Sequence, residues 1–397
     1  MIKKGCEILI IGAGITGLTI ASELIKRNIY PIYIIEKESE LACHASGRNS
    51  GVLHSGIYYT PDSLKAKFCV QGNKLMKQYC KQNNLPLLEC GKVILAKDEK
   101  EHEGLLELKR RADGADAYAE IIDENTLHKI EPYAKTSSIA LYAPNTAVIE
   151  PIAIMKSLCN ELTKSYKCYI NFTTKFIKLK SSNIAVTNKG LIYFNKCINA
   201  AGAYADKVAH TFGIGKEYKI LPFKGIYKKL KKEKNHMIRG NIYPVPDLRN
   251  PFLGVHFTRS ANDIVYVGPT AIPSFGRENY NIIDGIGSES ISILYRDAIL
   301  FLYNDSFRYS ALNEIKKYRY YYFYRAAQSL IPMLEYKDLL PSTKIGIRPQ
   351  LINCNKKELV NDFIIIQTDN SIHILNAISP AFTTSMAFAT YIVNKIT

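Results

Sequence analysis

Hydrophobic and polar positions follow two different periods along the chain, and together they predict an α/β protein. Residues 7–28 have the pattern of a short apolar strand, a glycine-rich turn and an amphipathic helix, and residues 29–37 add a second strand. Amphipathic helices are predicted over residues 64–83 and 151–166, and short alternating strands within residues 169–194. Strands that alternate with helices are typical of a parallel sheet covered by helices.

The remaining stretches predict a second kind of structure. Residues 41–59 are rich in glycine, serine and asparagine and predict a loop held against a ligand. Residues 98–130 are charged and mostly helical in pattern, residues 221–270 alternate like strands, and residues 285–335 are helical. Two short strands and a helix of small and apolar residues are predicted within residues 363–397.

Length and composition indicate a folded protein of two domains. The chain has 397 residues, 47% hydrophobic and 22% charged, and single cores rarely exceed roughly 250–300 residues. No apolar run reaches the ~18–20 residues of a membrane span. The first strand begins at about Glu7, which leaves no room for a signal peptide, so we expect a cytoplasmic location. Nine cysteines without a C-x-x-C pair predict reduced thiols and no metal site.

Positive charge is the strongest bias in the composition. Lysine and arginine number 52 against 36 acidic residues, a net charge of +16. Such a charge attracts acidic substrates, anionic lipid headgroups or nucleic acid. A lysine cluster within residues 224–234 is either a solvated loop or a contact with an anionic membrane surface. No nucleic-acid-binding module accompanies the charge, so we expect no nucleic-acid partner.

The spacing of glycines near the N-terminus predicts a dinucleotide site. Gly12 allows a tight turn after the first strand, Gly14 lets the backbone approach a pyrophosphate, and Gly17 lets the helix pack on the strand. Glu36, at the end of the second strand, is placed to accept hydrogen bonds from the ribose hydroxyls. A carboxylate there would repel a 2′-phosphate, which argues against NADP.

Several longer stretches resemble a known family. Besides the N-terminal unit they are residues 46–59, 63–73, 240–258 and 376–385. With these stretches the chain resembles the D-amino-acid-oxidase superfamily of FAD enzymes and, within it, the L-2-hydroxyglutarate dehydrogenase (oxidase) family.

The resemblance implies a fold and an activity. It implies a Rossmann-type FAD-binding domain made of residues 1–85, 148–220 and 341–397. A substrate domain built on a mixed β-sheet, residues 86–147 and 221–340, is inserted into it. The implied reaction oxidises L-2-hydroxyglutarate to 2-oxoglutarate by hydride transfer to flavin N5. Electrons then pass to a quinone chain or to oxygen, in the cytoplasm or at the inner face of the membrane, without metal or NAD.

Oxidation of a 2-hydroxy acid needs a base for the hydroxyl proton. Histidine has a suitable pKa, and two of the eight histidines, His54 and His256, lie in the resembling stretches. Both remain candidates, and either could instead order the backbone near the cofactor.

A dicarboxylate substrate also needs cations. Arginine binds a carboxylate bidentately and stays charged when buried. The resemblance implies that Arg348 grips the first carboxylate, and Lys224, Arg259 or Arg48 could bind the second. Tyr58 could donate a hydrogen bond to the substrate or pack against the flavin.

The FAD contacts are expected in the glycine turn, the loop before residue 52, and the turns that follow later strands. The N-terminal dipole of the last helix would stabilise negative charge on the reduced flavin. The expected residues are Gly12, Gly14, Gly17, Glu36, Lys37, Ser46, Gly47, Asn49, Ser50, Gly51, Thr174, Ala200, Gly202, Asn376, Ser379, Pro380 and Ala381.

Some positions depart from the family pattern, among them Pro349, Ile378 and Phe382. They keep two alternatives open. One is another FAD enzyme of this superfamily, acting on an amino acid, an amine or glycerol phosphate. The other is an FAD-binding protein that has lost turnover.

Overall fold

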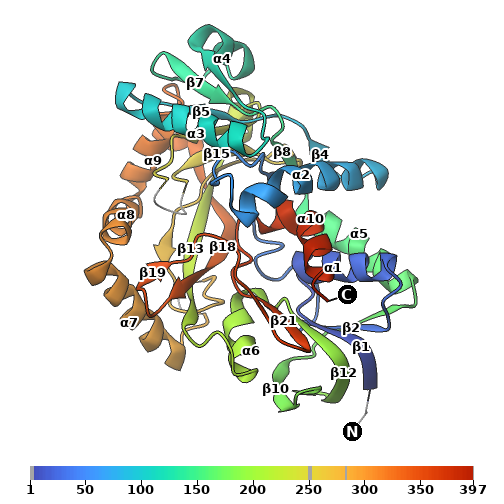
Figure 1. Ribbon diagram of the computed structural model, residues 1–397. Helices are drawn as coiled ribbons and strands as arrows, with labels where there is room; N and C mark the ends of the chain where they lie inside the picture. The colour runs from blue at the N-terminus through green and yellow to red at the C-terminus, as the bar shows by residue number, and fades with distance from the viewer. Residues whose placement is uncertain (1–3, 249–252, 282–283, 397) are drawn as a thin grey trace. The chain divides into compact units, whose positions relative to one another are not determined.

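The computed structural model describes residues 4–248, 253–281 and 284–396 (Figure 1). The chain divides into two units, and each is assembled from separate stretches of sequence. The second unit is inserted twice into the chain of the first. The first unit contains Met1–Arg48, Pro151–Pro222 and Arg348–Thr397, and the second contains Asn49–Glu150 and Phe223–Ile347.

Residues 49–85 belong to the second unit, whereas we expected them in the FAD-binding domain. The reason is strand pairing. Strand β8 (Ala147–Ile149) pairs antiparallel with both β3 (Val52–Leu53) and β4 (Leu87–Leu88). Helix α2 (Leu64–Gln82) lies in the chain between β3 and β4 and belongs to the same unit as these strands. Smaller shifts of the boundary affect residues 148–150, 221–222 and 341–347.

The first unit is built on a mixed sheet with a parallel centre. Strand β1 (Lys4–Ile11) lies between β12 (Gly190–Asn199) and β2 (Ile32–Ile35), parallel to both. Strand β9 (Cys168–Asn171) continues the parallel sheet beyond β2, and β21 (Ser371–Ile374) does so beyond β12. The antiparallel edges are β10 (Phe176–Ser181), β11 (Ile184–Thr187) and β20 (Ile365–Gln367).

Helices cover both faces of this sheet, so the central strand β1 is buried throughout Ile8–Ile11. Helix α1 (Ile15–Lys26) packs against α10 (Ala381–Val393), the blue and red helices that lie side by side in Figure 1. α1 also packs against α5 (Pro151–Lys164), and the short helix α6 (Ala205–Thr211) contributes Val208 to a core with Leu9. The predicted Rossmann-type α/β fold is confirmed.

A second mixed sheet, most of it in the second unit, has ten strands. Its centre is β14 (Asn241–Pro244), parallel to β5 (Val93–Leu95) and antiparallel to β15 (His256–Arg259). Residues 249–252, part of a stretch that carries the family resemblance, lie outside the described residues. Further strands of the sheet are β6 (Glu120–Asp123), β7 (Ile139–Tyr142), β13 (Tyr218–Leu230), β16 (Val265–Gly268), β17 (Ile272–Pro273), β18 (Leu339–Asn353) and β19 (Glu358–Leu359).

Alternation along these strands gives the sheet two different faces. One face packs Val93 and Phe257 against Phe323 of helix α9 (Tyr320–Gln328). The other face packs Ile94 and Tyr243 with α3 (His102–Gly114). Lys92 is two residues before Ile94 of this second face, and His256 is one residue before Phe257 of the first face, so both side chains lie on the second face.

The helical predictions for the second unit are confirmed. Residues 98–130 are mostly helical, in α3 and α4 (Glu124–Ile130), and β6 lies between these helices and pairs with β7. Residues 285–335 form three helices, α7 (Ser288–Tyr303), α8 (Asp305–Lys316) and α9.

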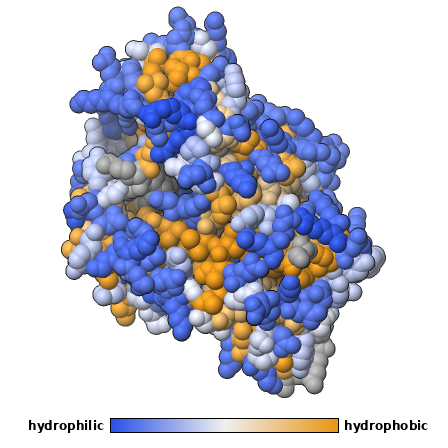
Figure 2. Space-filling view, in the orientation of Figure 1, coloured by the Kyte–Doolittle hydropathy of each residue, from blue (hydrophilic) through white to orange (hydrophobic). Residues whose placement is uncertain are grey.

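No helix among the described residues is both long and apolar enough to cross a membrane. Figure 2 shows a largely hydrophilic surface interrupted by patches of apolar residues.

A buried histidine holds part of the first sheet. His373 on β21 is fully buried, with Nδ1 3.1 Å from the Asn199 side-chain amide and Nε2 2.9 Å from the Ser371 hydroxyl. Phe212 packs edge-on against its ring. Burial lowers the pKa of His373 from 6.5 to about 4, because it disfavours the charged imidazolium.

We therefore expect the protein to lose stability in mild acid. The folded pKa of His373 is lower than the unfolded one, so its contribution is complete above pH 6.5 and is lost as the pH falls towards 4. The slope is at most about 1.4 kcal/mol per pH unit. Urea unfolding of the wild type and of His373→Gln between pH 7 and pH 4.5 measures it. Identical slopes for the two proteins would contradict this role of His373.

Candidate cofactor and substrate sites

The glycine turn after β1 is shaped by a close approach to the end of β12. Gly12 has φ +109°, and a Cβ there would lie 2.5 Å from the carbonyl oxygen of Ala200. The Ala200 amide in turn donates to the carbonyl of Ile11 at 3.0 Å. Only glycine combines this φ with this approach. Gly202, in the same turn after β12, also has a positive φ, +53°.

The N-terminus of α1 is open to an anion. Gly14 is its N-cap and makes no side-chain capping bond, and the first turn carries no acidic residue. Ser46 places its hydroxyl 3.0 Å from the amide of Ile15. A Cβ on Gly17 would lie 2.1 Å from the carbonyl oxygen of Gly12, so the helix packs directly on the turn. The helix dipole and free amides at such an end bind phosphate.

Glu36 lies beside this turn, as predicted from its spacing. Its carboxylate accepts hydrogen bonds from the amides of Ala13 and Glu38, both at 3.0 Å. The Thr174 amide donates to the Glu36 carbonyl at 2.7 Å. Because Glu36 is only partly buried, its carboxylate can still accept bonds from a ribose.

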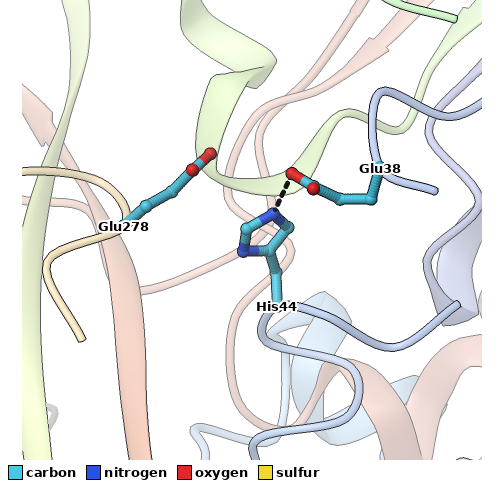
Figure 3. A group of neighbouring side chains, drawn as sticks. All are labelled: Glu38, His44 and Glu278. Atoms are coloured by element: carbon cyan, nitrogen blue, oxygen red, sulfur yellow. Dashed lines mark hydrogen bonds and ion pairs between the residues drawn. The ribbon is translucent and has the colours of Figure 1, made fainter. Parts of the chain in front are cut away.

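Lys37, predicted to contact FAD, belongs to a cluster of charged side chains. Its ammonium contacts the Glu38 carboxylate and lies 2.9 Å from His44 Nε2. His44 Nε2 lies 2.8 Å from the same carboxylate, the pair joined by a dashed line in Figure 3. Glu278, also drawn there, belongs to the second unit. Burial acts to raise the Glu38 pKa, but hydrogen bonds from Lys37 and His44 outweigh it and leave the pKa lowered.

The other predicted cofactor positions lie in two turns, one before β3 and one before α10. In the loop before β3, a Cβ on Gly47 would lie 2.1 Å from the Ala42 carbonyl oxygen. Ser46 and Gly47 belong to the first unit, whereas Asn49, Ser50 and Gly51 belong to the second. There the Gly51 amide donates to the Asn49 side-chain oxygen at 2.9 Å, and the Val52 amide to the Ser50 hydroxyl at 3.4 Å.

The turn before α10 has Ser379 and a cis Pro380, after which the helix begins at Ala381. Asn376 is fully buried and structural. Its amide donates to the carbonyls of Val360 and Asp362, each at 2.8 Å, and its oxygen accepts from the Leu351 amide. A side-chain contact of Asn376 with the cofactor is therefore not supported.

His256 lies on the second face of the sheet, the face that also carries Tyr243 and Lys92. Its ring stacks on Tyr243 with centroids 3.8 Å apart and planes at 14°. Nδ1 lies 2.8 Å from the Gly254 carbonyl oxygen. A carbonyl can only accept, so the neutral ring carries its proton on Nδ1 and is basic at Nε2.

His54 and Tyr58 come from the loop after β3 and are buried in the second unit. The His54 carbonyl accepts hydrogen bonds from the Asn73 amide at 3.1 Å and from the Cys69 thiol at 3.4 Å. The Tyr58 hydroxyl is buried and has no hydrogen-bond partner in the described part of the chain. Burial raises the pKa of Tyr58 well above its usual value, so the hydroxyl remains a donor.

Lys92, which sequence reasoning missed, lies beside Tyr58. Its ammonium is 4.4 Å from the Tyr58 ring centroid and 4.9 Å from that of Tyr243. In the sequence it is one lysine before an apolar strand. No local signal distinguishes it from an ordinary surface lysine.

Two of the cations predicted to bind the second carboxylate, Arg259 and Lys224, already donate hydrogen bonds to backbone carbonyls. Arg259 donates to the carbonyls of Asn235 and Ile238 at 3.1 and 2.6 Å and pairs with Asp263. Arg259 is thus a structural residue, and its predicted contact with substrate is corrected. Lys224 donates to the Asn281 carbonyl at 2.8 Å, and burial lowers its pKa.

The other two arginines predicted to bind substrate, Arg48 and Arg348, belong to the first unit. Arg48 donates through Nε to the Cys43 carbonyl at 2.6 Å, within its own loop. Arg348 lies on β18 and is half-buried.

Comparison with known proteins identifies the family. Residues 7–395 match the family model described as FAD dependent oxidoreductase (DAO). The chain belongs to this family.

Relatives in the family are similar along their whole length. The mitochondrial L-2-hydroxyglutarate dehydrogenase of Nematostella vectensis is 35% identical over 98% of this chain and 90% of its own. The L-2-hydroxyglutarate dehydrogenase of Escherichia coli K12 is 34% identical over 98% and 93%. Among solved structures, the FAD-bound L-α-glycerophosphate oxidase of Mycoplasma pneumoniae superposes with TM-score 0.77 at 23% identity, covering 98% of this chain and 94% of that one.

The first unit fits the FAD of this FAD-dependent oxidoreductase family. The glycine turn leaves a backbone cradle that a Cβ at Gly12 would fill, and the α1 N-terminus carries no acidic side chain to repel a pyrophosphate. Glu36 stands beside the same turn. These residues would hold the adenosine diphosphate half of the cofactor.

Replacement of Gly12 by alanine should damage folding and FAD retention together. The Cβ clash with Ala200 and the positive φ together predict a loss of roughly 2 kcal/mol or more in the free energy of unfolding. Gly5→Ala on the same strand is the matched control, because a Cβ there meets nothing within 4 Å. Urea unfolding and the flavin absorbance per purified chain measure the two effects. A Gly12→Ala protein with wild-type stability and flavin content would contradict the role of this turn.

Proposed function

We propose that this chain oxidises L-2-hydroxyglutarate to 2-oxoglutarate. Relatives named L-2-hydroxyglutarate dehydrogenase, 33–35% identical over nearly the whole chain, support the substrate. The observation that supports the chemistry is a buried group of side chains in the second unit, where Tyr243 contacts both His256 and Lys92. When bound, FAD supplies the acceptor for the hydride from the carbinol carbon.

His256 is the proposed base for the hydroxyl proton. Its neutral ring is basic at Nε2, as the bond to Gly254 requires, and stacking on Tyr243 holds the ring in one orientation. A neutral imidazole nitrogen can accept the proton of a reacting hydroxyl. His54 is the second candidate, buried in the same unit.

Arg348 is the proposed partner of the carboxylate next to the oxidised carbon. Its planar guanidinium can hold that carboxylate through two hydrogen bonds. Tyr58, whose hydroxyl stays protonated, is the proposed second donor. We propose FAD contacts for the remaining positions of the glycine turn, for the backbone at Thr174, and for the turns at Ala200 and Ala381.

The reduced cofactor must pass its electrons on, and we propose a quinone in an anionic membrane as acceptor, with oxygen as the alternative. Helices α7–α9 support contact with a membrane, because they expose large apolar and aromatic side chains. Ile291 is 76% exposed, Leu302 67% and Tyr318 70%. The net charge of +16 would draw this surface to anionic lipid.

Anaerobic addition of L-2-hydroxyglutarate should bleach the flavin absorbance, whereas the D enantiomer and glycine should not. In Arg348→Ala we expect kcat/KM to fall about 30-fold, the equivalent of ~2 kcal/mol for a charged hydrogen bond. Arg110→Ala, on the exposed side of α3 where Glu103 and Glu107 pair with it, is the matched control. Bleaching by amino acids alone would refute the substrate, and an unchanged kcat/KM in Arg348→Ala would remove that residue from its role.

Flotation with anionic vesicles tests the membrane contact. We expect the protein to float with vesicles containing phosphatidylserine and to do so less at high salt. Serine in place of Ile291, Leu302 and Tyr318 should abolish flotation, whereas Tyr166→Ser, at a tyrosine 85% exposed in the first unit, should not. Equal flotation of the triple variant, or no flotation of the wild type at low salt, would refute this surface.

A further inference from the structure

The ammonium of Lys92 is enclosed in the second unit. Lys92 comes immediately before β5, and its backbone exchanges hydrogen bonds with Ala143 at 3.1 and 2.8 Å. The residue is only 1% exposed.

No anion accompanies this ammonium. Its Nζ has no hydrogen-bond partner in the described part of the chain. The titratable groups that face it are the tyrosines Tyr58 and Tyr243 and the thiol of Cys69. Burial raises the pKa of Cys69 to about 12, so this thiol is not a counter-ion.

Burial without a counter-ion is costly. It lowers the pKa of Lys92 to about 7, because an unpaired buried charge is strongly disfavoured. Two contacts with tyrosine rings offset only part of this cost. A hydrophobic residue would fill the same space without this cost, so packing alone does not account for a lysine.

Lys92 and the proposed base, His256, contact the same aromatic ring, that of Tyr243. Strand β14 lies between β5 and β15. Tyr243 on β14 is contacted by Lys92 from the β5 side, and it stacks with His256 of β15 at 3.8 Å. A ligand that extends from His256 past Tyr243 along this face would meet the Lys92 ammonium.

Other donors on this face also lack an acceptor. The Tyr58 hydroxyl and the Thr258 hydroxyl are buried without hydrogen-bond partners in the described part of the chain. Thr258 is two residues after His256 on β15 and so points to the same face. An ammonium and two hydroxyls without an acceptor match a carboxylate, which has only acceptor atoms.

We propose that Lys92 binds the second carboxylate of the substrate, the one remote from the oxidised carbon. Lys92 is then the residue that selects dicarboxylates over 2-hydroxy acids with one carboxylate. The inference rests on the proposed function, in which a 2-hydroxy dicarboxylate gives its hydroxyl proton to His256. It assigns to Lys92 the role first considered for Arg259 and Lys224, which already donate to backbone carbonyls.

Substrate pairs that differ only in the second carboxylate test this role. For Lys92→Met, which keeps the length and apolar bulk of the side chain, we expect kcat/KM for L-2-hydroxyglutarate to fall about 100-fold. For L-2-hydroxyvalerate, which lacks the second carboxylate, we expect a change of less than about threefold. Lys92→Arg should recover most of the preference for the dicarboxylate, because it restores the charge.

Lys228→Met is the matched control. Lys228 lies on β13 of the same sheet and also stacks on a tyrosine, Tyr320, at 5.2 Å. Its cross-strand partner is Val267, which belongs to the opposite, apolar face. We expect wild-type values for this variant with both substrates. Equal losses for both substrates in Lys92→Met, or no loss, would overturn the proposal.

Binding of glutarate and valerate separates this inference from the proposed reaction. Calorimetric titration of the FAD-loaded protein needs no turnover, and we expect glutarate to bind more tightly than valerate only when residue 92 is charged. If the wild type oxidises no 2-hydroxy acid but shows this preference, the reaction is refuted and the carboxylate role stands. If it oxidises L-2-hydroxyglutarate and Lys92→Met keeps the preference, the role of Lys92 is refuted. A wild type that neither oxidises L-2-hydroxyglutarate nor binds glutarate refutes both.

Discussion

The close approach of Gly12 to the carbonyl of Ala200 is the constraint on which the first unit depends. It brings the ends of β1 and β12 together, where Ala200 also donates to Ile11. The chain can then turn directly into α1, whose first turn carries no acidic residue. A side chain at Gly12 would force the strands apart and fill the cradle. The same contact thus supports both the fold and the cofactor site.

The second unit depends on a different constraint, the burial of a positive charge beside aromatic rings. Tyr58, Lys92, Tyr243 and His256 form a continuous series of contacts on one face of the sheet. The opposite face is an apolar core with α9. Ile94, Leu105 and Leu108 also pack on the face that carries this series, so buried apolar contacts with α3 hold the four residues in place.

Features that depend on local spacing were predictable from the sequence. Gly12, Gly14, Gly17 and Glu36 lie within one strand–turn–helix–strand unit, so their positions follow from the periods of its elements. The Rossmann-type fold followed from the same pattern. Arg259 was placed with the substrate because arginine suits a carboxylate, but its partners, Asn235 and Ile238, are brought to it by the folded chain. Residues 49–85 lie in the second unit because β3 pairs with a strand almost a hundred residues later, which local spacing does not reveal.

Lys92 shows most clearly why the rest was not predictable. Its burial beside His256 depends on the pairing of β5 with β14, about 150 residues later in the chain, and on the pairing of β14 with β15. An isolated lysine before an apolar strand is ordinarily solvated. Only the pairing of the strands shows that it is buried, without an anion, next to a histidine.

The most direct measurement of the central claim is an equilibrium titration of the FAD-free protein with FAD, followed by quenching of flavin fluorescence. The account predicts saturation at one FAD per chain, with ADP competing for the site and NADP⁺ unable to displace the cofactor. A folded protein that binds no FAD, or one from which NADP⁺ displaces it as readily as ADP does, would contradict it.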